Sequence, residues 1–232
     1  MDYNEDVIKA RLTEIQKNIN LAMKRAGREN PPKIVAVTKT HPPELLNIIK
    51  KIGIEHVGEN YVQEMLRKIE VHGELKWHFI GNLQRNKVKY IIGRVYLIHG
   101  VDSLKLVEEI DKRAKIAGIT QNILIQINQG EESKGGLKKD ELEMFVKELN
   151  RFDNVCLKGL MGLPPYYEDP EKVRPFFMEI RELLEIINRK SLYKERLTEL
   201  SMGMSSDYIV AVEEGSTILR IGTALFGERV KN

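Results

Sequence analysis

The sequence predicts an α/β fold, a single (β/α)8 barrel of the TIM type with one extra helix at its N-terminus. Eight short apolar runs of strand type alternate with stretches long enough for a helix. Such alternation favours a parallel sheet, and eight units are the number that closes the barrel. The alternative, an open doubly wound sheet, would need a GxGxxG or GxxxxGKS/T turn after its first strand, and the chain has neither. We expect residues 1–232 to form one domain, with a helix in residues 1–30 packed on the barrel.

The individual elements follow from the periodicity of the apolar residues. Apolar residues at three- and four-residue spacing from Val7 to Met23 predict an amphipathic first helix, which Gly27 ends. The strands are expected at 33–39, 54–59, 76–81, 95–100, 122–128, 155–161, 197–203 and 217–222. The helices between them are expected at 44–51, 61–71, 84–92, 103–117, 139–150, 171–190 and 206–214.

Composition limits the class of protein and its partners. The 37 Lys and Arg residues against 34 Asp and Glu give a net charge of only +3, so the surface has mixed sign and nucleic acid is not an expected partner. The single cysteine, Cys156, allows neither an internal disulfide nor a thiolate metal site, which favours a reducing compartment. The acidic start is unlike a signal peptide, and no apolar run approaches the ~20 residues of a membrane span. We expect a cytoplasmic protein without a membrane partner.

Lys39 is the first candidate site residue. Active sites of such barrels lie at the carboxyl ends of the strands, and Lys39 ends the first one. It shares strand parity with Val35 and Val37, so a lumen-facing amine would be desolvated and its pKa depressed. A neutral amine attacks a carbonyl to form a Schiff base. The alternative is a strand-end lysine that reaches into water.

The loops after the last two strands are the second candidate. The segment from Ser201 to Asp207, which includes Met204 and Ser205, is rich in small hydroxyl-bearing residues, and the eighth strand is followed by Gly222 and Thr223. Barrels often bind phosphate there through backbone N–H groups. The alternative is that these are ordinary turns, in which Ser205 or Ser206 caps the next helix. Because the eighth strand pairs with the first, the loops are expected beside Lys39.

Arg220 shares parity with Ile218 and Gly222 and is expected in the same lumen. Beside a pyridine ring, its permanent charge would keep the ring nitrogen unprotonated. The alternative is a buried ion pair with Glu199 or Glu213. An amine for an aldehyde, backbone donors for a phosphate and a cation for a ring nitrogen together fit pyridoxal 5′-phosphate (PLP). A Schiff-base aldolase that uses Lys39 without a cofactor is a further alternative.

No metal site is expected. His56 and His78 lie in strand-type runs without an HxH or HExxH partner, which favours core packing over metal binding.

At these residues the sequence resembles the pyridoxal phosphate homeostasis proteins, a family related to the N-terminal barrel of the fold-type III alanine racemases. The segments that carry the resemblance span the chain in order: 35–40, 58–64, 77–87, 101–103, 134–136, 159–162, 200–205, 214–217 and 220–227. The resemblance implies a fold-type III PLP-binding barrel in which Lys39 holds the cofactor as a Schiff base. It also implies that Ser205, Gly222 and Thr223 hold the phosphate, with the Met204 backbone nearby. Arg220 would face the pyridine nitrogen, and Asn60 would line the ring pocket.

The function that the resemblance implies is intracellular PLP homeostasis, as a carrier or regulator of vitamin B6 and of the linked amino-acid pools. The related racemases add a C-terminal β domain that supplies a second base, a tyrosine. The chain ends five residues after Gly227, so we expect no such domain, a monomer, and no robust catalysis. The partners would be PLP and apo PLP-dependent enzymes. The alternative is a weak PLP-dependent amino-acid racemase.

Overall fold

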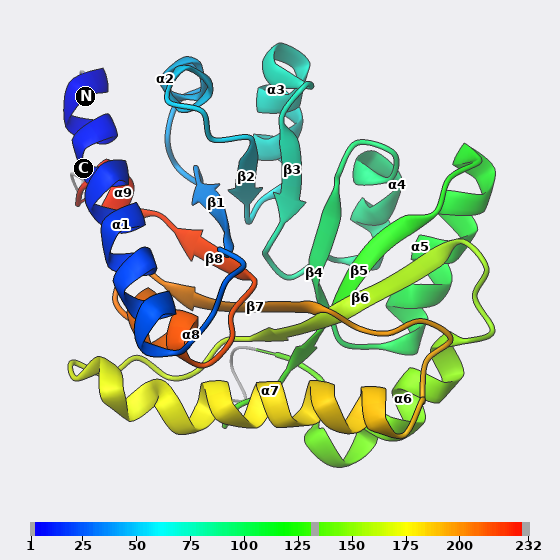
Figure 1. Ribbon diagram of the computed structural model, residues 1–232. Coiled ribbons are helices and arrows are strands. Elements are labelled where there is room, and N and C mark those ends of the chain that lie inside the picture. The colour runs from blue at the N-terminus through cyan, green and yellow to red at the C-terminus, as the bar shows by residue number, and fades with distance from the viewer. Residues whose placement is uncertain (1–2, 131–134, 229–232) are drawn as a thin grey trace.

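Eight parallel strands close into a barrel in the computed structural model of the chain, which describes residues 3–130 and 135–228 (Figure 1). Each strand pairs with the next, and β8 pairs with β1, so the predicted (β/α)8 fold is confirmed. The strands are β1 (Lys33–Val37), β2 (His56–Glu59), β3 (Lys76–Phe79), β4 (Leu97–Val101), β5 (Gln121–Ile127), β6 (Val155–Gly162), β7 (Glu199–Met204) and β8 (Ile218–Ile221). The first strand ends two residues earlier than predicted, so Lys39 lies in the turn that follows it. Lys134 of the resembling segment 134–136 is outside the described residues.

Helices surround this barrel (Figure 1). They are α1 (Glu5–Arg25), α2 (Leu45–Lys51), α3 (Val62–His72), α4 (Val88–Ile91), α5 (Leu104–Ala117), α6 (Leu142–Leu149), α7 (Arg174–Arg189), α8 (Tyr208–Glu213) and α9 (Thr223–Phe226). Three of the predicted helices begin with a 3-10 turn: η1 (Arg85–Lys87), η3 (Lys139–Glu141) and η4 (Pro170–Val173). The short helix α9 was not predicted.

The first helix, α1, covers the closure of the barrel. Asn4 caps it by accepting a hydrogen bond from the Val7 N–H at 3.2 Å, and acidic residues in its first turn and basic residues in its last complement the helix dipole. It lies beside α8 and α9, as Figure 1 shows, and Asn18 donates to the Tyr208 hydroxyl at 3.1 Å. The helix ends at Arg25, two residues before Gly27, where the sequence predicted its end.

The apolar core has two parts. The larger part fills the space between strands and helices, and a smaller cluster fills the barrel itself: Val35, Leu97, Leu124, Met161 and Ile218. Because side chains fill the lumen, a ligand site is left only at its ends. Over the described ranges, none of the helices combines the length and apolarity that crossing a bilayer would take. Nor do three His, Cys, Asp or Glu side chains come together there as metal ligands.

Candidate functional site

A pocket of about 680 Å³ opens at the carboxyl ends of the strands. All seven residues that the resemblance assigned to the cofactor line it: Lys39, Asn60, Met204, Ser205, Arg220, Gly222 and Thr223. Ser206 and Ala224, which also line it, belong to the two loops predicted to bind phosphate. Sequence reasoning missed the rest of the lining: Val37, Ile80, Met161, Leu163, Tyr166 and Glu228. Val37 and Met161 could have been found, because they stand at or beside the carboxyl ends of predicted strands. Tyr166 lies in a long connection where strand parity carries no information.

The turn after β1 presents Lys39 to the pocket. The Thr38 N–H donates to the Gly58 carbonyl at 3.0 Å, which extends the pairing of β1 with β2 by one residue. Thr40 then adopts a left-handed φ of 67°, and its N–H donates to Glu64 Oε1 at 2.6 Å. Lys39 is half-buried between these two anchored residues. The turn therefore fixes the main chain on both sides of the amine.

A buried ion pair lies beneath this turn. Lys68 is 2 % exposed and donates to Glu59 Oε1 at 2.6 Å and to the Thr38 carbonyl at 2.7 Å. It also donates to Glu64 Oε1 at 2.8 Å. Burial raises the pKa of Glu59 above its usual value, and the ammonium of Lys68 opposes that rise. Sequence reasoning missed the pair of Lys68 with Glu59. The i, i+4 spacing of Glu64 and Lys68 on one helix face was a signal that Lys68 has a carboxylate beside it.

The predicted phosphate loops meet through Ser205. Its Oγ accepts from the Gly222 N–H at 3.2 Å and from the Ala224 N–H at 3.1 Å, so these main-chain donors converge on one point beside the pocket. The alternative that Ser205 or Ser206 caps the next helix is wrong. The N-cap of α8 is Asp207, whose carboxylate instead accepts from the Met204 N–H at 2.6 Å.

Arg220 is fixed at the edge of the lumen, where the nearby carboxylate of Asp207 attracts it but no carboxylate of the described residues forms a salt bridge with it. It is 4 % exposed, and Nη1 donates to the Ser201 carbonyl at 2.8 Å while Nη2 donates to the Gly162 carbonyl at 2.9 Å. The alternative of an ion pair with Glu199 or Glu213 is wrong. Glu199 binds Lys33, and Glu213 binds two arginines of the outer helices, Arg25 and Arg174. Burial lowers the pKa of Arg220 to about 10, so the side chain stays charged at neutral pH.

A row of three histidines runs across the lumen to Arg220. His56 Nδ1 lies 2.8 Å from His78 Nε2, and His78 Nδ1 lies 2.8 Å from His99 Nε2. His99 Nδ1 lies 2.9 Å from Ser201 Oγ, which accepts from Arg220 Nη1 at 2.7 Å. The prediction that His56 and His78 serve in core packing was thus incomplete, because it left out these polar contacts between strands.

The row predicts a loss of stability in mild acid. Burial lowers the pKa of His78 to about 3 and that of His99 well below its usual 6.5. As the pH falls below 6.5, the unfolded chain takes up protons on both imidazoles and the folded chain does not. The free energy of unfolding should therefore fall with pH, by up to about 1.4 kcal/mol per pH unit for each histidine.

Urea unfolding at about pH 7, 6 and 5 measures this slope above the usual pKa values of carboxylates, which are about 4. The substitution His99→Leu is the matched variant. Its free energy of unfolding should depend less steeply on pH, because unfolding then takes up one proton fewer. A free energy of unfolding that stays constant over this range would contradict the prediction.

Asn60 is positioned by Gly81, which the sequence places in a resembling segment. A Cβ on Gly81 would lie 2.3 Å from the Asn60 carbonyl oxygen. Gly81→Ala should therefore displace Asn60 from the pocket and lower the free energy of unfolding by about 1–3 kcal/mol, as measured in urea. In the control Gly73→Ala the nearest atom is 3.2 Å away, so the loss should be smaller. Equal losses in the two variants would contradict this account.

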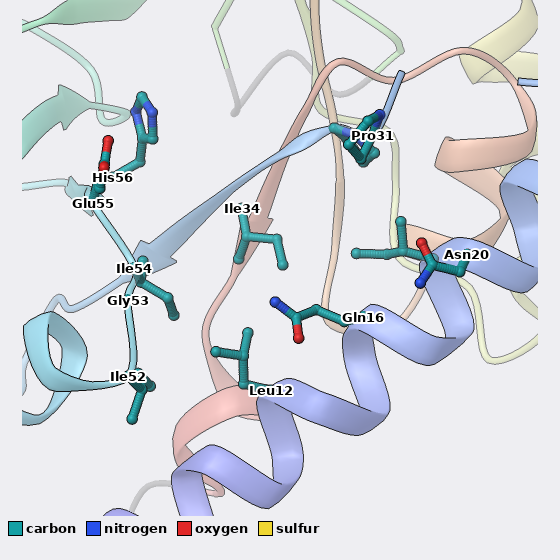
Figure 2. A pocket seen from close by; sticks show the side chains of 12 residues that line it. Leu12, Gln16, Asn20, Pro31, Ile34, Ile52, Gly53, Ile54, Glu55 and His56 are labelled. Atoms are coloured by element: carbon teal, nitrogen blue, oxygen red, sulfur yellow. The ribbon is translucent and has the colours of Figure 1, made fainter. Parts of the chain in front are cut away.

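A second cavity, of about 400 Å³, lies at the opposite ends of the strands. Figure 2 shows Gln16 and Asn20 of α1 on one side of it, and Glu55 and His56 at the start of β2 on the other. None of the predicted cofactor residues lines it. The outer end of the histidine row therefore reaches a cavity that is separate from the candidate site.

Three comparisons relate the chain to known proteins. The sequence model of the family described as alanine racemase, N-terminal domain, matches residues 10–230. A pyridoxal phosphate homeostasis protein of Aquifex aeolicus (strain VF5) is 48% identical over 223 residues, which cover 94% of this chain and 97% of the relative. The structure of PipY from Synechococcus elongatus PCC7942 with PLP bound is 32% identical with a TM-score of 0.82, covering 95% of this chain and 100% of PipY. The chain therefore belongs to the alanine racemase N-terminal domain family and, within it, to the pyridoxal phosphate homeostasis proteins.

Proposed function

We propose that this protein binds PLP in the pocket at the carboxyl ends of the strands and acts as a carrier or regulator in PLP homeostasis. The observation that carries the proposal is the meeting of Lys39, the Ser205 loop and Arg220 around one pocket. The name of the Aquifex relative and the PLP bound to PipY support it.

The donor set of the pocket suits each part of this cofactor. The Lys39 amine supplies the nucleophile that an aldehyde needs to form a Schiff base, with release of one water. The N–H groups of Gly222 and Ala224, with the hydroxyls of Ser205 and Thr223, suit a phosphate. Asn60 Oδ1 is buried and makes no hydrogen bond within the described residues, so it can accept one from a ligand.

We propose further that the protein catalyses no robust reaction. PLP draws carbanion charge into its ring best when the ring nitrogen is protonated, and a charged Arg220 beside that nitrogen disfavours the proton. One observation favours the alternative of a weak racemase, because Tyr166 lines the pocket and could serve as a second base. Exchange of the amino-acid α-proton in deuterated water separates the two functions. Exchange above that of free PLP which Tyr166→Phe abolishes would establish the racemase.

The binding proposal is tested on the purified protein by its visible absorbance and its intact mass after borohydride reduction. The expected result is one covalently attached PLP. Aldol cleavage of a phosphorylated substrate by a protein that takes up no PLP would establish the cofactor-free aldolase instead.

As a carrier, the protein should pass PLP to apo PLP-dependent enzymes as a cytoplasmic monomer. The free, buried Cys156 agrees with a reducing compartment. Transfer is measured as recovered activity of an apo-enzyme mixed with the loaded protein across a dialysis membrane and without one. Sedimentation velocity gives the oligomeric state.

A further inference from the structure

The histidine row joins five strands inside the barrel. His56, His78 and His99 stand on β2, β3 and β4, and Ser201 and Arg220 stand on β7 and β8 across the lumen. His78, His99 and Ser201 are fully buried. The row therefore links Arg220, at the PLP pocket, to the cavity at the other end of the barrel.

Arg220 sets the direction of every hydrogen bond in the row. A guanidinium only donates, so the Ser201 oxygen accepts from Arg220. Among the described residues the proton of this buried hydroxyl has His99 Nδ1 as its one other hydrogen-bond partner, so Ser201 donates to His99. The proton of His99 then lies on Nε2 and is donated to His78 Nδ1. By the same step His78 donates from Nε2 to His56 Nδ1. All three rings are thus the Nε2–H tautomer.

This direction is also the one that a buried positive charge favours. The unprotonated nitrogen is the negative end of a neutral imidazole, and in each ring of the row it points toward Arg220. Aligned dipoles in a low-dielectric interior polarise one another and strengthen the bonds between them. The hydrogen-bond acceptors of Arg220 are uncharged: the Ser201 carbonyl and hydroxyl and the Gly162 carbonyl. The Asp207 carboxylate attracts the guanidinium without a hydrogen bond between them among the described residues.

We propose that His99, His78 and His56 are positioning residues for Arg220. Their aligned dipoles add to the attraction of the Asp207 carboxylate and hold the guanidinium charged and fixed beside the pocket. The effect of the row on bound PLP rests on the function proposed above. The tautomers and the neutral charge of the three histidines do not depend on that function.

The electrostatic surroundings keep the row neutral. The charged and titratable groups near its outer end are Lys33, Lys76, Glu55, Glu199 and Tyr96. Burial lowers the pKa of His56 the most, and the two lysines lower it further, whereas the two glutamates raise it. Arg220 and His78 add to the effect of burial on the pKa of His99. Protonation of any ring would place a cation facing Arg220 along the row.

The first experiment reads the tautomers by long-range 1H–15N NMR of the histidine rings in the wild-type protein, with and without added PLP. Near neutral pH the expected result is that His56, His78 and His99 all carry one proton, on Nε2. A proton on Nδ1 of His78 or His99 would overturn the proposal. This measurement requires no substitution and no cofactor binding, so it stands even where a variant does not fold.

The second experiment measures the effect on the bound cofactor. His99→Leu should shift the visible absorbance maximum of bound PLP and weaken its binding about three- to tenfold, the effect of losing a bond in a network with a charged group. His72→Leu is the matched control, a buried histidine outside the row, and should change neither. A folded His99→Leu protein with wild-type absorbance and affinity would overturn the positioning role. If the wild-type protein takes up no PLP, the proposed function fails and the NMR result still decides the state of the row.

Discussion

Replacing Lys39 with alanine is expected to remove the visible absorbance of the Schiff base and to lower the affinity for PLP by on the order of a hundredfold, about 2.7 kcal/mol. Lys39 lines the pocket on a turn whose neighbours on both sides are tied to β2 and α3. A fixed main chain holds the amine where an aldehyde can react, and alanine offers no nucleophile. Absorbance titration with PLP, followed by borohydride reduction and mass measurement, gives both quantities.

The matched control is Lys105→Ala, on the exposed face of α5, which should bind PLP as the wild type does. A Lys39→Ala protein that keeps the absorbance and the covalent mass would show that another lysine carries the cofactor. Unchanged affinity without absorbance would show that binding does not depend on the covalent link.

Replacing Lys68 with methionine is expected to lower the free energy of unfolding by about 3–5 kcal/mol, the cost of leaving a buried charge without its partner. Glu59 is fully buried and receives hydrogen bonds from Lys68 at 2.6 Å and from Thr38 Oγ1 at 2.6 Å. Without the ammonium, Glu59 must take up a proton or remain an uncompensated anion. Urea unfolding near neutral pH measures the loss.

Two further variants test the cause of that loss. In Lys50→Met the same change removes an exposed ion pair with Glu74, and stability should hardly change. Adding Glu59→Gln to Lys68→Met should restore part of the lost stability, because the uncompensated charge is then gone. A Lys68→Met protein as stable as the wild type would show that the pair is not needed in the fold.

Much of the barrel could be predicted from the sequence because each strand and helix leaves a local signal. Apolar periodicity located every strand to within a few residues, and strand parity placed Arg220 in the lumen. The predicted strand 33–39 extends beyond the end of β1 because Thr40 turns the chain with a left-handed φ. Nothing in the residues Thr38-Lys39-Thr40 indicates that turn.

Contacts between distant strands could not be predicted in the same way. His78 and His99 are 21 residues apart, and Ser201 follows 102 residues later. Parity shows that a side chain faces the lumen, but which ones meet depends on how the strands are staggered around the closed barrel. The Glu59–Lys68 pair was missed for a related reason. Its importance depends on its burial in the folded barrel, and the helix pattern of the sequence does not show how deeply Lys68 is buried.

In the proposed role as a PLP carrier, the Ser205 hydroxyl affects how the phosphate group is bound and released. A hydroxyl can accept or donate, and here it accepts from the N–H groups of Gly222 and Ala224. When a phosphate takes over these donors, Ser205 can turn its own proton toward the anion. When the phosphate leaves, the Ser205 hydroxyl accepts from the two N–H groups again. The N–H groups of Gly222 and Ala224 therefore have a hydrogen-bond acceptor both with and without the phosphate. Release of the phosphate then leaves neither main-chain N–H group without an acceptor, which suits the proposed role of a protein that gives up the PLP it binds.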